Sequence, residues 1–91
     1  MRELDLYKNP QKVLEKLSVS DKKICSAILK KIENLLVNPL PDSSRKLTGF
    51  KDLHRIRIDK YRLIYKFDDK ILSILHIAKR DDVYDFLRRL K

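Results

Sequence analysis

The sequence predicts a single α+β domain spanning residues 1–91, with the element order β-α-α-β-β-β-α. Two observations predict this class. Apolar residues recur at helical spacing in the first half of the chain and at alternating spacing in the second half. A chain of 91 residues can bury one core, but two independent cores are unexpected at this length. We expect a mainly antiparallel sheet with a helical hairpin on one face and a basic, open face on the other.

The chain is expected to begin with a short strand and a first helix. Residues 2–7 alternate, and Leu4 and Leu6 fall on one side, which is the period of a half-buried strand. Asn9 followed by Pro10 resembles a helix cap with proline at the first helical position. The first helix is therefore expected to start at this pair.

A second helix follows and gives the clearest helical pattern of the chain. Its apolar stripe consists of Ile24, Ala27, Ile28, Ile32, Leu35 and Leu36. Ser18 or Ser20 is expected to cap it. Cys25, the single cysteine, cannot form an internal disulfide and is expected to fill the core. Asn38 and the prolines after it end the helix, and a loop is expected to reach about Gly49.

Three strands and a final helix are expected after this loop. Residues 53–58, 61–67 and 71–78 are rich in β-branched and aromatic side chains and predict an antiparallel meander. Residues 71–78 are almost continuously apolar, as expected for a strand covered on both faces near the middle of a sheet. Asp81 or Asp82 is expected to cap the final helix.

The first two strands of the meander predict a basic face. If Asp59 and Lys60 form a two-residue turn, antiparallel pairing places Arg57 opposite Arg62. The side chains facing the helices are then Ile56, Ile58, Tyr61, Leu63, Tyr65 and Phe67. Those on the other face are Arg55, Arg57, Arg62 and Lys66.

Two opposed arginines repel each other, at a cost of a few tenths to about 1 kcal/mol. A phosphate between Arg57 and Arg62 would replace the repulsion with charge-assisted hydrogen bonds, which favours a phosphate site. The alternative is a solvated strand face partly neutralised by Asp59 or Asp68.

The net charge of +9 is unevenly distributed. Residues 1–44 hold eight basic and six acidic side chains, and residues 45–91 hold fourteen and seven. A localised basic excess indicates a polyanionic partner, either a nucleic acid or an acidic protein segment.

Cofactors and membranes are not expected. The chain has a single glycine and thus no glycine-rich phosphate loop, and His54 and His76 lack metal-ligand spacing. We read His54 as packed with the core residues or at a sheet edge, and His76 is uninformative. Residues 1–7 are charged and are not followed by an apolar run, so no signal peptide is expected. No apolar segment approaches the length of a transmembrane helix, and we therefore expect a cytoplasmic protein.

Several short motifs in the second half carry a family resemblance. They are Lys46-Leu47-Thr48-Gly49, Leu53-His54-Arg55-Ile56-Arg57-Ile58, Tyr61-Arg62-Leu63-Ile64-Tyr65 and Ile77-Ala78-Lys79-Arg80-Asp81-Asp82-Val83-Tyr84. Their order and spacing resemble the RelE/ParE toxin superfamily, whereas the first half matches only in layout. The resemblance implies a RelE-like fold and a toxin of a type II toxin-antitoxin pair. RelE members cut messenger RNA in the ribosomal A site without a metal, and the ribose 2′-hydroxyl attacks the adjacent phosphate to give a 2′,3′-cyclic phosphate.

The resemblance also implies roles for individual residues. Arg55 and Arg57 match the basic pair of the first meander strand, Arg62 the phosphate-binding arginine, Arg80 the arginine near the leaving oxygen and Tyr84 the stacking tyrosine. RNA contacts are expected from Lys46, Lys51, Lys66 and Lys79. RelE itself has lysines in place of Arg55 and Arg57, and arginine does not readily give up its proton, so the proton acceptor is unassigned.

Three functions remain open on the sequence. The first is a ribosome-dependent messenger RNA endoribonuclease. The alternatives are a ParE-like inhibitor of DNA gyrase and a non-catalytic basic RNA-binding module. The expected partners are the ribosome with its messenger RNA and a cognate antitoxin that wraps the toxin with an acidic segment.

Overall fold

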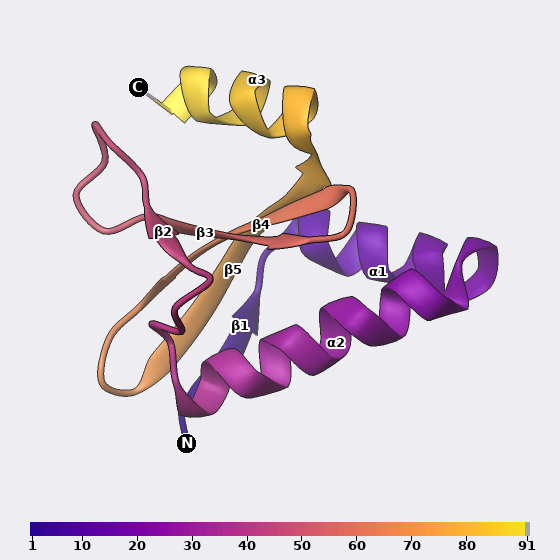
Figure 1. Cartoon of the computed structure of the whole chain (residues 1–91), viewed down its shortest axis with the longest axis horizontal. Helices are drawn as coiled ribbons and strands as arrows, with labels where there is room; N and C mark the ends of the chain where they lie inside the picture. The colour runs from indigo at the N-terminus through magenta and orange to yellow at the C-terminus, as the bar shows by residue number, and fades with distance from the viewer. Residues whose placement is uncertain (91) are drawn as a thin grey trace.

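A five-stranded sheet forms the centre of the computed structural model, which describes residues 1–90 (Figure 1). The elements in chain order are β1 (Glu3–Leu6), α1 (Lys8–Ser20), α2 (Lys22–Val37), β2 (Arg45–Lys46), β3 (His54–Ile58), β4 (Tyr61–Phe67), β5 (Ile71–Lys79) and α3 (Arg80–Leu90). The strand order is β1-β5-β4-β3-β2, with β1 parallel to β5 and every other pair antiparallel. The α+β class and the antiparallel meander are therefore confirmed.

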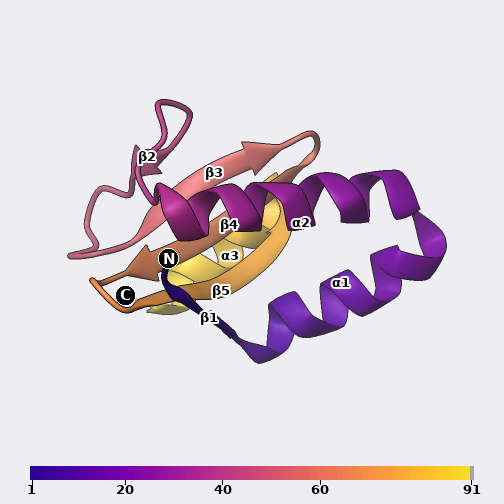
Figure 2. The same ribbon diagram turned by 90° about the horizontal axis from the view of Figure 1, so that it is seen from below.

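The two faces of the sheet are covered differently. The hairpin of α1 and α2 packs on one face and α3 lies on the other (Figure 2). The main core between the hairpin and the sheet includes Ile28, Ile32, Leu35, Ile56, Leu63, Tyr65, Leu72, Ile74 and Ile77. Cys25 is buried in this core, as expected.

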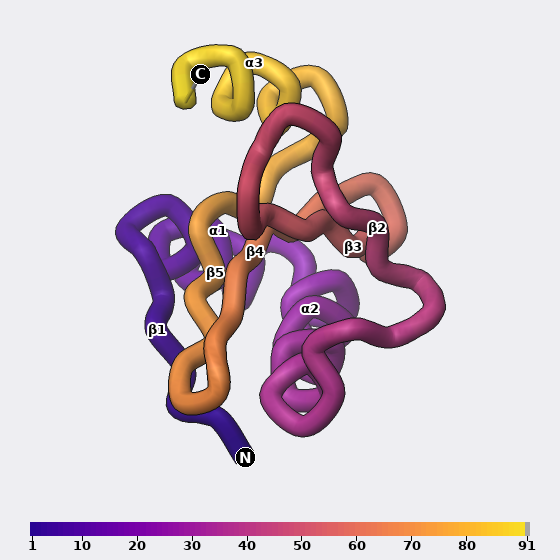
Figure 3. The backbone as a smooth tube through the Cα atoms, turned by 90° about the vertical axis from the view of Figure 1, so that its left-hand side faces the viewer, coloured from indigo at the N-terminus to yellow at the C-terminus, as the bar shows by residue number. Residues whose placement is uncertain are grey.

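The second face is only partly open. A smaller core there joins Leu53, Ile64, Leu75 and Val83, with Phe86 and Leu87 of α3 packed against it. Leu47 and Phe50 also pack against this cluster, and the loop between β2 and β3 rises toward α3 to bring them there (Figures 1 and 3). The strand β5 lies inside the sheet and contributes to both cores, which confirms its expected burial on both faces.

The helix starts differ from the sequence expectation. The first helix begins at Lys8 instead of Pro10, so Asn9 lies inside it. The Asn9 side chain does not cap the helix: its Oδ1 accepts a hydrogen bond of 2.8 Å from the backbone N–H of Ile77 on β5. The second helix is capped by Asp21, which accepts from the N–H of Ile24 at 3.2 Å.

Neither expected serine cap operates. Ser18 and Ser20 lie inside the last turn of α1, where their hydroxyls donate to the carbonyls of Glu15 and Lys16. The final helix likewise starts at Arg80, directly after β5, and Asp81 and Asp82 lie within its first turn.

Two further differences concern the edges of the sheet. The segment expected to be a loop contains β2, which is only two residues long and pairs with β3. The strand β1 is an edge strand beside β5, and Leu4, expected on its half-buried side, is 42% exposed. In the described chain, none of the helices combines the length and the apolar character that crossing a membrane requires.

Candidate functional site

The hairpin of β3 and β4 has the register expected from the sequence. Ile58 lies opposite Tyr61 and Arg57 opposite Arg62, with Asp59 and Lys60 at the turn. Asp59 adopts a left-handed backbone conformation with φ 54°, which a tight two-residue hairpin requires and aspartate tolerates. Arg57 and Arg62 therefore project from the face opposite the helical hairpin, about 4.5 to 5.5 Å apart at their Cα atoms.

Arg55 lies one step further along β3 on the same face as Arg57. It pairs with Ile64 of β4 on one side and with Arg45 of β2 on the other. Arg45 was not expected from the sequence, because a two-residue strand is too short to produce an alternating pattern. The face therefore holds two cross-strand arginine pairs.

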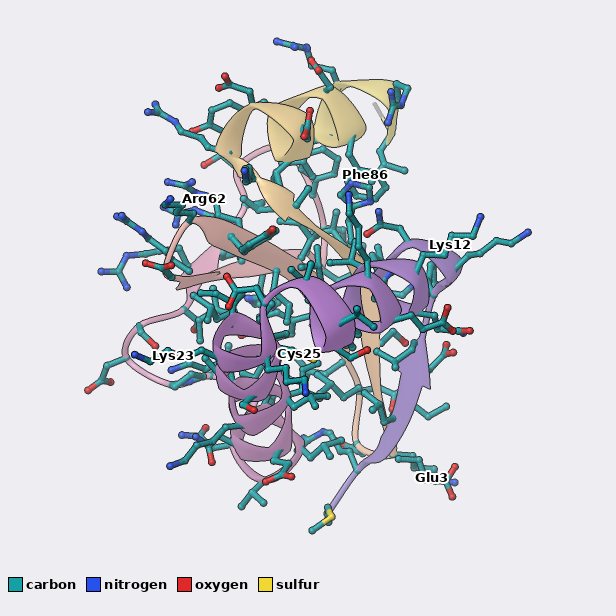
Figure 4. All side chains as sticks on the ribbon, turned by 90° about the vertical axis from the view of Figure 1, so that its right-hand side faces the viewer. Glu3, Lys12, Lys23, Cys25, Arg62 and Phe86 are labelled. Carbon is teal, nitrogen blue, oxygen red and sulfur yellow. The ribbon has the colours of Figure 1, made fainter. Side chains whose placement is uncertain are left out.

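The first turn of α3 adds an arginine and a tyrosine to this face. Arg80 Nε lies 3.4 Å from Tyr84 Oη, and the Arg80 guanidinium carbon is 5.5 Å from the centre of the Tyr84 ring. Tyr84 is 43% exposed, so it is not a core residue despite its place in an amphipathic helix. Arg62 projects outward from the sheet on the side where α3 begins (Figure 4). Arg55, Arg57, Arg62, Arg80 and Tyr84 are called the arginine cluster below.

The arginines of the cluster act on the titration of the Tyr84 phenol. The hydrogen bond from Arg80 and its charge lower the pKa of the Tyr84 phenol, and the charges of Arg62 and Arg55 lower it further. The same hydrogen bond raises the pKa of Arg80. A tyrosine surrounded by three cations from β3, β4 and α3 favours its ionised form more than a free tyrosine does.

No cluster arginine forms an ion pair with a carboxylate in residues 1–90, although the charge of Asp81 acts on Arg80 and helps to raise its pKa. Within residues 1–90 the ion pair found is Arg88 with Asp85 on α3, and it involves none of the cluster arginines. Arg57 Nε donates to the backbone carbonyl of Asp59 at 3.1 Å, which fixes its direction without reducing its charge. The cluster is therefore a concentrated cationic surface suited to a phosphate group.

The four lysines expected to bind RNA are not gathered with the cluster. Lys46 lies opposite His54 and so faces the side of the helical hairpin, and Lys51 is exposed in the loop before β3. Lys79 lies opposite Tyr61, also on the hairpin side.

Lys66 shares the face of the cluster but lies toward the opposite end of β4, next to Ser73. It lines a shallow hollow together with Asp5, Asp52 and Asp68. These carboxylates make its surroundings less favourable for a phosphate than those of the cluster.

Both histidines pack against aromatic side chains. His54 packs against Tyr65 and Phe67 on the hairpin side, and burial lowers its pKa, with the charge of Lys46 adding to the effect. His76 stacks on Phe86 with ring centres 4.1 Å apart, and burial lowers its pKa as well. Figure 4 shows Phe86 between α3 and the sheet. Within the described residues no three His, Cys, Asp or Glu side chains are grouped so as to hold a metal ion.

Comparison with known families places this fold and site in context. Residues 4–84 match the sequence profile of a family described as the ParE toxin of the type II toxin-antitoxin system parDE. Two curated proteins of Methanocaldococcus jannaschii, named as toxins RelE4 and RelE1, are 33% and 31% identical to the chain. The matches cover 92% of both this chain and RelE4, and 89% of this chain and 92% of RelE1.

Solved structures of RelE toxins are also similar to this chain. The archaeal RelE-RelB complex from Pyrococcus horikoshii OT3 contains a chain 29% identical to this one, with a TM-score of 0.73 over 87% of this chain and 94% of that one. A mutant of E. coli toxin RelE in the free state has a TM-score of 0.73 at 24% identity, and the match covers 99% of this chain and 98% of that one. At that identity the likeness to the E. coli structure concerns the fold.

Proposed function

Because the chain belongs to the RelE/ParE toxin superfamily and is the toxin of a toxin-antitoxin system, we propose that it is an endoribonuclease that cuts messenger RNA on the ribosome. The observation that carries this proposal is the arginine cluster. Guanidinium groups from β3, β4 and α3 lie on one face with the Tyr84 phenol, and none of them forms an ion pair among the described residues. The proposed place of action is the cytoplasm.

The side chains of the arginine cluster can supply the charge stabilisation that this cleavage needs. The ribose 2′-hydroxyl gives its proton to an acceptor and forms a bond to the adjacent phosphorus. The bond from that phosphorus to the 5′-oxygen of the next nucleotide breaks, and this oxygen takes up a proton from water, which leaves a 2′,3′-cyclic phosphate and a free 5′-hydroxyl. Negative charge grows on the phosphoryl oxygens in the transition state, and preorganised cations stabilise it. In this proposal Arg55 and Arg62 hold the phosphate, and Arg80 lies near the leaving oxygen.

Proton transfer requires a group other than arginine, because a guanidinium does not deprotonate in proteins. Tyr84 is the titratable side chain of the cluster whose pKa is lowered, by Arg80 first and by Arg62 and Arg55 after it. We propose Tyr84 as the proton acceptor, because its side chain is exposed and its Oη lies 3.4 Å from Arg80 Nε, next to the arginines that would hold the phosphate. The exposed ring can also stack on a base of the message.

The similar complexes support an antitoxin as a partner of this chain. The RelE-RelB complex and a YoeB-YefM complex from Staphylococcus aureus are toxins bound to antitoxins, which supports an antitoxin partner for this chain. The ribosome and its messenger RNA are part of the proposal.

Cleavage can be tested by mapping message ends in translating extracts with and without the protein. We expect new 3′ ends within A-site codons, carrying cyclic phosphates. Arg62→Ala and Arg80→Ala are expected to abolish the cuts, with circular dichroism used to verify that both variants fold. The matched control is Lys30→Gln, which removes an exposed cation from α2 and should cleave normally.

A gyrase inhibitor is a second candidate, because the matching family profile is named for ParE. This function needs no cleavage chemistry. Inhibition of supercoiling by purified gyrase with intact messages would favour it over the nuclease. Harmless expression, with neither effect, would leave a non-catalytic RNA-binding module.

A further inference from the structure

Arg45 occupies a defined place beside the arginine cluster. It forms one of the two residue pairs between β2 and β3 and lies directly opposite Arg55. Directly opposed residues of antiparallel strands project from the same face. Arg45 therefore extends the cationic face by one strand, toward the β2 edge of the sheet.

The guanidinium of Arg45 is anchored without being neutralised. Its Nη1 donates to the backbone carbonyls of Asp42 and Ser44, both at 2.8 Å. Both acceptors are uncharged, and no ion pair involves Arg45 within the described chain. Its plane is thus fixed by its own loop, its charge is retained, and Nε and Nη2 are not used in these two bonds.

A purely structural role does not explain the pair of Arg45 and Arg55. Strand β2 has only two residues, so the repulsion between Arg45 and Arg55 falls on one of its two cross-strand pairs. Like charges directly opposed across strands disfavour pairing. An anion bound at this edge would remove that penalty, as it would for Arg57 and Arg62.

We propose that Arg45 binds a phosphate of the RNA strand next to the one held by Arg55 and Arg62. The inference rests on the proposed function and adds to it a second phosphate site at the β2 edge. Neighbouring strands of a sheet are about 4.8 Å apart, so Arg45 lies one strand spacing from Arg55. Arg62 is further away, since it lies two strands from Arg45 and two residues along β4 from Ile64, the residue in line with Arg55 and Arg45. That separation suits consecutive phosphates of one extended strand better than two oxygens of a single phosphate. The arrangement also sets the course of the message from α3 toward β2.

The test is equilibrium binding to a single-stranded RNA oligonucleotide made non-cleavable by 2′-O-methylation, measured by fluorescence anisotropy across a range of salt concentrations. Arg45→Gln is expected to bind several-fold more weakly than the unmodified protein. Its plot of log affinity against log salt should be less steep by about 0.7, the value for one lost phosphate contact on a single strand. Arg45→Lys should restore the slope, because lysine also neutralises a phosphate.

The matched control is Lys30→Gln, which removes the same charge from the exposed side of α2 and should leave the slope unchanged. If Arg62→Gln weakens binding but Arg45→Gln behaves like Lys30→Gln, the second phosphate site is wrong and the proposed function stands. If the unmodified protein shows no salt-dependent RNA binding, the second phosphate site is wrong, and the proposed function is decided separately by the message ends in translating extracts. Loss of affinity for a glutamate-rich peptide with RNA binding unchanged would also overturn the inference, and would place Arg45 on a protein-binding surface.

Discussion

Tyr84 is the residue whose chemistry depends most on its neighbours. The cations around it lower the pKa of its phenol, and Arg80 has the largest effect. Removing Arg80 should therefore raise that pKa toward the ordinary value of a tyrosine, near 10. We expect an NMR titration of ring-labelled tyrosine to show one signal that ionises at lower pH than the others and that moves upward in Arg80→Gln. A signal that does not move would mean that Arg80 and Tyr84 are not in contact in solution.

The two histidines predict a second pH dependence, in stability. Burial lowers the pKa of both His54 and His76, so the unfolded chain binds protons more readily than the folded one as pH falls. The free energy of unfolding should therefore be highest above the unfolded histidine pKa of about 6.5, where both histidines are neutral in either state, and it should decrease as the pH falls below that value.

Urea denaturation at about pH 7.5 and about pH 5.5 measures this loss on either side of the histidine pKa. The variant His54→Phe keeps a ring against Tyr65 and Phe67 but removes the titrating group, so its loss should be smaller. An unchanged loss in this variant would rule out His54 as a contributor. As a control, urea denaturation of the unmodified protein and of His54→Phe is compared at two pH values between about 7 and about 8, where the histidines are neutral and should add no pH dependence to either protein.

At the scale of elements, the start of α2 shows that the type of a residue does not by itself decide whether it caps a helix. Ser18, Ser20 and Asp21 all have side chains that can cap a helix, and the sequence alone does not choose among them. The choice depends on where α1 ends: this helix continues through Ser20, so the hydroxyls of both serines bond back to carbonyls of their own helix. Asp21 is the residue left between the two helices.

Asp21→Ala should accordingly destabilise the protein by about 1 kcal/mol, because it removes the acceptor for the N–H of Ile24. Ser20→Ala is the control and should be nearly neutral, since a serine bonded back within a helix stabilises it little or not at all. Thermal or urea unfolding measures both. Equal effects of the two substitutions would contradict the assigned cap.

The strands show what periodicity can and cannot predict. The register of the β3-β4 hairpin followed from alternation and from a two-residue turn, and the pairing of Arg57 with Arg62 is as expected. The position of Arg45 could not be predicted, because β2 forms only through pairing with β3 and has no pattern of its own. The same holds for Asn9, whose side chain bonds to an amide 68 residues away.

At the scale of the whole molecule, the site depends on packing that joins distant parts of the second half. Arg80 and Tyr84 reach the sheet arginines because Val83 is buried against the second face and holds the first turn of α3 there. The helical pattern alone would have placed Tyr84 in the core beside Phe86 and Leu87, whereas the family resemblance implied a stacking tyrosine. Only the direction of α3 after β5 shows that it is exposed beside the cluster.

This concentration of charge should make the cluster a source of instability as well as of function. Arg62 lies opposite Arg57, with no carboxylate in an ion pair with either one among the described residues. Arg62→Gln should therefore raise the free energy of unfolding at low salt by a few tenths to about 1 kcal/mol. The same substitution should abolish RNA cleavage, because the variant loses a cation that holds the phosphate.

Salt distinguishes this local repulsion from other causes of stabilisation. In about 1 M salt the screening length is about 3 Å, so the advantage of Arg62→Gln over the unmodified protein should disappear. Lys30→Gln lowers the net charge equally from α2 and should gain less at low salt, because no cation lies opposite it across a strand. Equal gains in the two variants would mean that net charge, not the opposed pair, destabilises the fold. A stable but inactive Arg62→Gln would show that the arginines are kept for the polyanion they bind, at the expense of the folded state.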